Sequence, residues 1–148
     1  MNKELKISII TVTKNSEKYL EENILSLESQ SYKNYEHIII DGNSTDQTKN
    51  IINRHKEKIS YSVSEPDDGL YFAMNKGIEK ATGEIIGILN SDDIFYPDAL
   101  RIVSKYFSKD PKLDFLFGSV YKHKLMHGYN PKKIKWTFGF YTTHSVGF

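Results

Sequence analysis

The sequence contains no cysteine, which excludes disulfide bonds, thiolate metal sites and cysteine nucleophiles. No apolar run approaches the roughly 18 residues that a membrane-spanning helix needs. The first residues, Met1 to Glu4, lack the pattern of a secretory signal peptide. The net charge is only +1, so overall electrostatics favour neither nucleic acid nor an anionic membrane as a partner. These absences favour an intracellular, cytoplasmic protein.

What the chain does contain is typical of one soluble globular domain. Its 148 residues suffice for a single hydrophobic core but hardly for two. Hydrophobic residues make up 39% and charged residues 26% of the chain, and both values are ordinary for such a domain.

Short runs rich in apolar and β-branched residues recur along the chain and predict strands. The run Glu84 to Leu89 is almost wholly apolar, which predicts burial on both faces and therefore a parallel sheet. The predicted strands are Lys6 to Val12, Tyr35 to Ile40, Ile59 to Ser64, Glu84 to Leu89 and Leu113 to Tyr121.

Helical periodicity in the intervals between these runs predicts four helices. Their alternation with the strands predicts right-handed βαβ units, and so an α/β fold with a Rossmann-like, mostly parallel sheet. The helices are expected at Glu17 to Gln30, after a capping box at Ser44 to Gln47, on a face made of Leu70, Met74, Ile78 and Ala81, and after Pro97.

The pattern ends after Tyr121. From His123 to Lys135 the chain has four Lys and two His without a clear period, which favours a long loop or an edge hairpin. The basic run Lys122 to Lys135 is interpreted as a solvated face, with binding of a polyanionic acceptor as the alternative.

Polar and acidic residues follow four of the predicted strands. They are Thr11 to Asn15, Asp41 to Ser44, Glu65 to Gly69 and Asn90 to Asp93. In a parallel sheet these ends lie along one edge, where open α/β sheets bind ligands. Carboxylates there would repel a phosphate unless a cation bridged the two, so the pattern indicates a divalent metal such as Mn²⁺ or Mg²⁺.

Each acidic strand end also has a purely structural interpretation. Asp41-Gly42 alone is typical of a turn, and Asp67 to Gly69 of a helix start favoured by the helix dipole. Asp92 and Asp93 would likewise cap the turn that follows them. The gathering of four such ends at one predicted edge is what favours a binding site.

Seven sequence blocks share an order and spacing that extend over roughly residues 5 to 120. They are Ile9 to Asn15, Tyr35 to Asp46, Ser64 to Tyr71, Ala73 to Gly77, Ala81 to Glu84, Leu89 to Asp93 and Tyr96-Pro97. In this order the blocks resemble the family 2 glycosyltransferases of the GT-A fold, in the subgroup that builds bacterial surface polysaccharides.

The resemblance implies a nucleotide pocket. The loop after the first strand and the acid after the second would hold the base and the ribose, with Asp41 accepting a hydrogen bond from a base N–H. Lys76 would reach the diphosphate as a point charge. The nucleotide-binding residues implied in this way are Thr11, Thr13, Asn15, Asp41, Asp67, Lys76, Asn90 and Ser91.

Asp92 and Asp93 correspond to the Asp-x-Asp element that binds Mn²⁺ or Mg²⁺ in the family. The chain departs from that element at its leading position, where Asn90 offers a hydrogen bond to a ribose hydroxyl but no charge. Adjacent residues of an extended chain point in opposite directions, so one of the two acids is expected to face the metal. The sequence leaves open which one.

The resemblance implies transfer of a sugar, with inversion of its anomeric carbon, from a nucleoside-diphosphate sugar to a saccharide or lipid-linked acceptor. The donor is expected to be a UDP-sugar, because the family commonly uses one. Family members usually run on past this chain's end, so the general base is expected beyond Phe148, with His144 as the candidate inside the chain. Residues 1–121 would form the nucleotide-sugar-binding domain. Residues 122–148 would begin its acceptor-side region.

The acceptor would allow peripheral membrane association, and apolar surface left open on an unfinished domain would favour a homo-oligomer. Two other functions fit part of the pattern. One is a non-catalytic nucleoside-diphosphate binder, and the other is a Mg²⁺-dependent receiver-like or phosphoryl-transfer domain. The second leaves Glu65-Pro66-Asp67 without a role.

Overall fold

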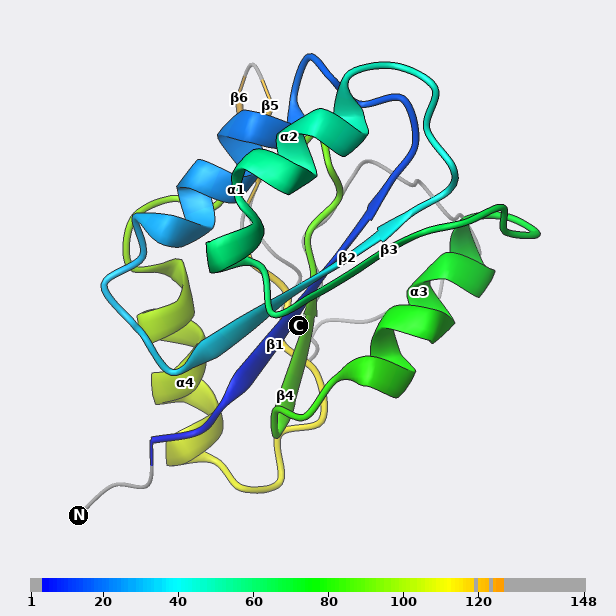
Figure 1. Ribbon diagram of the computed structural model, residues 1–148. Helices are drawn as coiled ribbons and strands as arrows, with labels where there is room; N and C mark the ends of the chain where they lie inside the picture. Colours follow the sequence, from blue (N-terminus) through cyan, green and yellow to red (C-terminus); the bar gives the residue numbers. More distant parts are fainter. Residues whose placement is uncertain (1–3, 119, 123, 127–148) are drawn as a thin grey trace, which may run out of the picture.

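The computed structural model describes residues 4–118, 120–122 and 124–126 (Figure 1). Its centre is a sheet of four parallel strands in the order β3-β2-β1-β4. The strands are β1 (Ile7–Thr13), β2 (Tyr35–Asp41), β3 (Tyr61–Ser64) and β4 (Ile85–Ile88). The predicted α/β fold with a mostly parallel sheet is therefore confirmed.

Helices cover both faces of this sheet (Figure 1). Helix α3 (Leu70–Lys80) lies on one face, while α1 (Leu20–Glu28), α2 (Thr48–Arg54) and α4 (Ala99–Lys109) lie on the other. A short 3-10 turn, η1 (Lys56–Lys58), follows α2. No helix in the described ranges is long and apolar enough to cross a membrane.

Strand β1 is the centre of the core, because every one of its seven residues is buried. Its side chains alternate between the two layers. Ile7 and Ile9 pack with residues of α1 and α4, while Ile10 and Val12 pack with Ala73 of α3. By contrast, the predicted burial of the fourth strand on both faces is only half correct, since alternate residues of β4 are partly exposed.

The prediction for the apolar face of α3 is only half correct. Met74 and Ala81 pack partly buried against the core, as predicted. Leu70 and Ile78 are 53% and 42% exposed, and the fully buried residues of the helix are Ala73 and Gly77. A Cβ placed on Gly77 would lie 2.4 Å from Cγ2 of Ile10, so the helix approaches the sheet too closely for large side chains. Small residues therefore form the closest contact, while Met74 packs beside them and Leu70 and Ile78 remain exposed.

The capping box predicted at Ser44 to Gln47 does not form. Helix α2 begins at Thr48, and the Ser44 hydroxyl donates to the Asp41 carboxylate instead of accepting from a helix N–H. The first turn is capped by Asp46, whose Oδ1 accepts a hydrogen bond from the Thr48 N–H over 3.0 Å. Its Oδ2 accepts one from the Glu17 N–H over 3.1 Å.

The predicted fifth strand, Leu113 to Tyr121, is also wrong. Strand β5 (Val120–Lys122) begins later and pairs antiparallel with β6 (Lys124–Met126), apart from the parallel sheet. The long loop or edge hairpin predicted for His123 to Lys135 is tested only at Lys124–Met126, which form the second strand of this separate pair. The rest of the basic run, from 127 to 135, lies outside the described residues.

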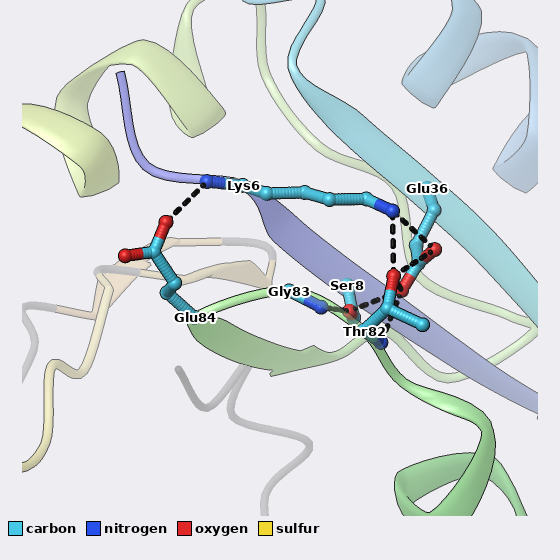
Figure 2. Close-up of polar contacts among 6 residues, drawn as sticks. All are labelled: Lys6, Ser8, Glu36, Thr82, Gly83 and Glu84. Atoms are coloured by element: carbon cyan, nitrogen blue, oxygen red, sulfur yellow. Dashed lines mark hydrogen bonds and ion pairs between the residues drawn. The ribbon is translucent and has the colours of Figure 1, made fainter. Parts of the chain in front are cut away.

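A polar network joins the strands near their amino ends, at the edge opposite to the predicted site (Figure 2). Glu36 accepts hydrogen bonds from Lys6 Nζ at 2.8 Å and from Ser8 Oγ and the Thr82 N–H, both at 2.6 Å. Burial alone would raise the pKa of Glu36, but these hydrogen bonds outweigh it and lower the pKa to about 2. The network ties the segment before β4 to β1 and β2.

Candidate functional site

The carboxyl ends of three neighbouring strands form one row of polar side chains. Thr13 of β1 lies in register with Asp41 of β2, and Asp41 lies in register with Ser64 of β3. The loops that follow all leave the sheet at this edge (Figure 1). The structure therefore brings together strand ends that are about 50 residues apart in sequence, as the parallel topology predicts.

Asp41 is fully buried and is held by serine donors. Its Oδ2 accepts hydrogen bonds from the Ser44 N–H over 3.0 Å and from the Ser64 hydroxyl over 2.5 Å, and its Oδ1 accepts one from the Ser44 hydroxyl. These donors compensate for the loss of water around the carboxylate. A base N–H would reach this fully buried carboxylate only after its surroundings moved.

Thr13 is the neighbour of Asp41 and is 4% exposed. Its hydroxyl oxygen is buried and finds no hydrogen-bond partner among the described residues. A buried hydroxyl normally has a partner, so this one is suited to accept or donate a hydrogen bond to a bound molecule.

The loops after β1 and β2 are bonded to each other through Asn15. Its N–H donates to Ser44 Oγ over 2.7 Å, and its Oδ1 accepts from the Thr45 N–H over 2.9 Å. Asn15 adopts a positive φ of 52°, which asparagine tolerates better than most residues. The polar atoms of Asn15 thus fix the loops after β1 and β2 relative to each other.

Asp67 stands against Gly42, beyond the end of β2. A Cβ placed on Gly42 would come within 3.1 Å of Asp67 Oδ2 and within 3.4 Å of Lys14 Cδ. The other oxygen, Oδ1, accepts a hydrogen bond from the Gly69 N–H over 3.0 Å. The loops that follow β1, β2 and β3 therefore meet at Gly42, where Lys14 comes from the first loop and Asp67 from the third.

Lys76 is bonded to an acid of the same edge. Its Nζ lies 2.7 Å from Oε1 of Glu65, and this hydrogen bond raises the pKa of Lys76, helped by the nearby charges of Asp67 and Asp68. The lysine predicted to reach a diphosphate is thus held beside carboxylates in this structure. It would have to leave Glu65 to meet a phosphate.

Asn90 to Asp93 form a tight turn at the end of β4, in which the Asp93 N–H donates to the Asn90 carbonyl over 3.0 Å. Ser91 and Asp92 are the two central residues of this turn. The Ser91 hydroxyl lies 2.9 Å from that of Ser16, which connects the turn to the loop after β1. Asp92 is exposed, whereas Asp93 is partly buried.

A metal would not find a complete set of protein ligands here. Among the described residues, no three His, Asp or Glu side chains gather into a metal site. Mg²⁺ is, however, commonly bound by one or two carboxylates together with water and substrate phosphates. An exposed acid at the tip of a fixed turn suits that mode of binding, so Asp92 fits an ion shared with a phosphate. Asp93 fits it less well, because one of its carboxylate oxygens is buried.

Thr11, the first of the residues proposed to bind nucleotide, is fully buried inside the fold. Its hydroxyl lies 2.9 Å from Nε2 of His37 and donates to Oδ1 of Asn23 over 3.4 Å. Burial lowers the pKa of His37 to about 3, so the ring is neutral. Thr11 therefore lies beneath the site rather than at its surface.

Sequence reasoning missed three residues near this edge. Asn23 and Gln30 of the α1 region are fully buried polar residues, and Asn23 bonds the turn at 90–93. Their signal was present, because both stand among Leu20, Ile24 and Leu27 on the apolar side of the helix. Lys14 carried no comparable signal. The candidate base His144 lies outside the described residues.

Comparison with known proteins agrees with this architecture. The chain matches the family described as Glycosyl transferase family 2 over residues 8–146. A solved relative is S. aureus TarS, residues 1–349, in complex with UDP-GlcNAc. The two sequences are 28% identical, and the match covers 71% of this chain and 32% of the TarS chain. The two structures superimpose with a TM-score of 0.65.

Curated relatives include an uncharacterized glycosyltransferase of Methanocaldococcus jannaschii, which is 32% identical over 138 residues, or 87% of this chain and 48% of the relative. A second is TuaG of Bacillus subtilis, described as a putative teichuronic acid biosynthesis glycosyltransferase. It is 35% identical over 98 residues, or 64% of this chain and 39% of the relative. The chain thus spans less than half the length of each of these relatives.

Proposed function

Because this chain belongs to glycosyl transferase family 2, we propose that it forms the donor-binding part of an enzyme that transfers a sugar from a nucleoside-diphosphate sugar to a saccharide or lipid-linked acceptor. The observation that carries the proposal is the row Thr13, Asp41 and Ser64, with the Asn90–Asp93 turn bonded to the same edge. The family assignment removes the receiver-like alternative.

The nucleoside would lie over the ends of β1 and β2. Asp41 offers a carboxylate to a base N–H, and the free hydroxyl of Thr13 is its neighbour. The complex of TarS with UDP-GlcNAc supports uracil as the base and a UDP-sugar as the donor. Asp67, held against Gly42, would border the same part of the ligand.

The diphosphate would lie toward the Asn90–Asp93 turn. This edge carries Asp41, Asp67 and the acids of the turn, so a bare diphosphate would be repelled. A bound Mn²⁺ or Mg²⁺ would neutralise charge that develops on the leaving nucleoside diphosphate. One of the two acids, the exposed Asp92, would face that ion with Asp93 beside it, and Lys76 would add a positive charge after release from Glu65.

The role of the chain's own residues is thus to orient the donor. Attack of an acceptor hydroxyl on the face opposite to the departing diphosphate would invert the anomeric carbon, with a general base outside the described residues. TuaG supports an acceptor of the cell-surface polysaccharide kind, since its description names teichuronic acid biosynthesis.

Calorimetric titration with UDP and GDP, each in MnCl₂ and in EDTA, tests the proposal. We expect UDP to bind more tightly with Mn²⁺ than without it. A wild-type protein that binds neither nucleotide under either condition would contradict the proposal. Binding without turnover of any UDP-sugar would instead favour the non-catalytic alternative.

A further inference from the structure

The face of α1 that points away from solvent carries a line of polar residues. Asn23 and Ser26 of α1 and Gln30, two residues beyond the end of the helix, follow one another at intervals of three and four residues, which places them on one side. Asn23 and Gln30 are fully buried and Ser26 is partly buried. Buried polar groups at these positions need partners, and they find them in one segment, residues 90–100, called here the acidic loop.

Asn23 bonds both ends of the turn that carries Asp92. Its Nδ2 donates to the carbonyl of Asn90 and to the carbonyl of Asp93, each over 2.8 Å. One amide therefore uses both of its N–H groups to close the four residues of the turn. Ser91 is held from the other side by Ser16.

The remaining residues of the line bond the outer part of the acidic loop. Ser26 Oγ accepts a hydrogen bond from the Phe95 N–H over 3.1 Å. Gln30 donates to the Tyr96 carbonyl over 2.9 Å and accepts from the Leu100 N–H over 3.2 Å. The backbone of the acidic loop is thus shaped by α1 along its length.

The orientation of the Asn23 amide is fixed by the buried residues Thr11 and His37. Its Oδ1 accepts a hydrogen bond from the Thr11 hydroxyl over 3.4 Å, and that hydroxyl lies 2.9 Å from Nε2 of His37. If Nε2 of the neutral ring carries the proton, it donates to Thr11 and leaves the hydroxyl proton for Asn23. This order of donors points both N–H groups of Asn23 at the turn.

We propose that Asn23 is a positioning residue that fixes the direction of Asp92 through the Asn90–Asp93 turn, with Thr11 and His37 holding the Asn23 amide in place. The inference rests on the proposed function, because it concerns an ion shared between Asp92 and a nucleoside diphosphate. Residues that orient metal ligands without touching the metal commonly contribute a factor of about ten or more to metal affinity.

The test compares Asn23→Leu, which keeps the size of the side chain, with Ser8→Ala as a matched control. Ser8 is equally buried but belongs to the network at the opposite edge, where it bonds Glu36 and Gly83. UDP affinity is measured by calorimetry in MnCl₂ and in EDTA for the wild type and both variants. The thermal midpoint of each protein is recorded beside it.

We expect both variants to melt at lower temperature, and only Asn23→Leu to lose the part of the affinity that Mn²⁺ adds, by about tenfold. Its affinity in EDTA should stay near that of the wild type. Full retention of the Mn²⁺ effect in Asn23→Leu would overturn the inference. An equal loss with and without Mn²⁺ would also overturn it, because that pattern reports general disruption.

Thr11→Val serves if Asn23→Leu does not fold. It keeps the shape of Thr11 but removes the hydroxyl that orients the amide, so a smaller loss of the Mn²⁺ effect is expected, and none would count against the inference. If the wild type itself binds UDP and GDP no better with Mn²⁺ than with EDTA, the metal step of the proposed function fails, and the inference fails with it.

Discussion

Gly42 and Asp67 stand in contact at the carboxyl edge of the sheet, although they belong to different strand ends. A Cβ on Gly42 would come within 3.1 Å of Asp67 Oδ2, which is tighter than an ordinary contact. Asp67 can occupy its place because residue 42 has no side chain. The close approach of Asp67 therefore gives a reason for glycine at position 42, in addition to the turn that Asp41-Gly42 predicts.

Gly42→Ala is therefore expected to displace Asp67. If Asp67 borders the nucleotide, UDP affinity should fall about fivefold, which is on the order of 1 kcal/mol. The measurement is calorimetric titration with UDP. Gly118→Ala is the control, because no atom of the described residues lies within 4 Å of the Cβ that it would add. Equal UDP affinity in the two variants would refute the role given to Asp67.

Gly77→Ala tests the close packing of α3 on β1. The added methyl would lie 2.4 Å from Cγ2 of Ile10, and such overpacking costs about 1–3 kcal/mol. Alanine also gains up to about 1 kcal/mol over glycine in a helix, so a net loss of stability identifies the clash as the stronger effect. Chemical denaturation measures the change.

The companion variant for this test is Ile10→Ala, which removes the methyl that Gly77→Ala would meet. We expect Gly77→Ala to cost less in the Ile10→Ala background than in the wild type, because the two sites are in contact. Additive costs would show that the helix does not pack against Ile10 in this way.

Glu36 gives the chain a specific dependence on pH. Its pKa is lowered from 4.5 to about 2 in the folded protein, so the unfolded chain binds a proton there first as the pH falls. The stabilisation is fully present above about pH 4.5 and is lost as the pH falls toward 2. At about 1.4 kcal/mol for each pH unit in that window, it amounts to about 3 kcal/mol.

The variant Glu36→Gln should accordingly be less stable than the wild type at neutral pH, and the difference should narrow below pH 4.5. Denaturant unfolding at several pH values measures it. Glu57→Gln is the control, since Glu57 is exposed and lies in η1, away from the network around Glu36. A gap between wild type and Glu36→Gln that does not change with pH would contradict the assigned network.

Much of the fold followed from the sequence, because the relevant signals are local. The apolar runs at 7–13, 35–41 and 85–88 form parallel strands, and parallel strands necessarily bring their carboxyl ends to one edge. The gathering of Thr13, Asp41 and Ser64 is thus a consequence of topology. It needed no knowledge of side-chain contacts.

The misplaced predictions concern choices that only tertiary contacts decide. Periodicity placed Leu70 and Ile78 on the apolar face of α3, but the helix lies so close to the sheet that Ala73 and Gly77 make the closest contact and Leu70 and Ile78 stay exposed. Ser44 had the position of a helix cap, yet the buried Asp41 carboxylate competes for its hydroxyl. Asn23 was missed although it lies on the apolar side of α1, and its partners at 90 and 93 could not be inferred because they are distant in sequence.

The central claim is that the acids of the Asn90–Asp93 turn bind a diphosphate through a shared cation. The most direct test is calorimetric titration of UDP, with MnCl₂ and with EDTA, into the wild type and into the double variant Asp92→Ala/Asp93→Ala. The account predicts that Mn²⁺ strengthens UDP binding to the wild type, and that this gain disappears in the double variant while both remain folded. An undiminished gain from Mn²⁺ in the double variant would contradict the account.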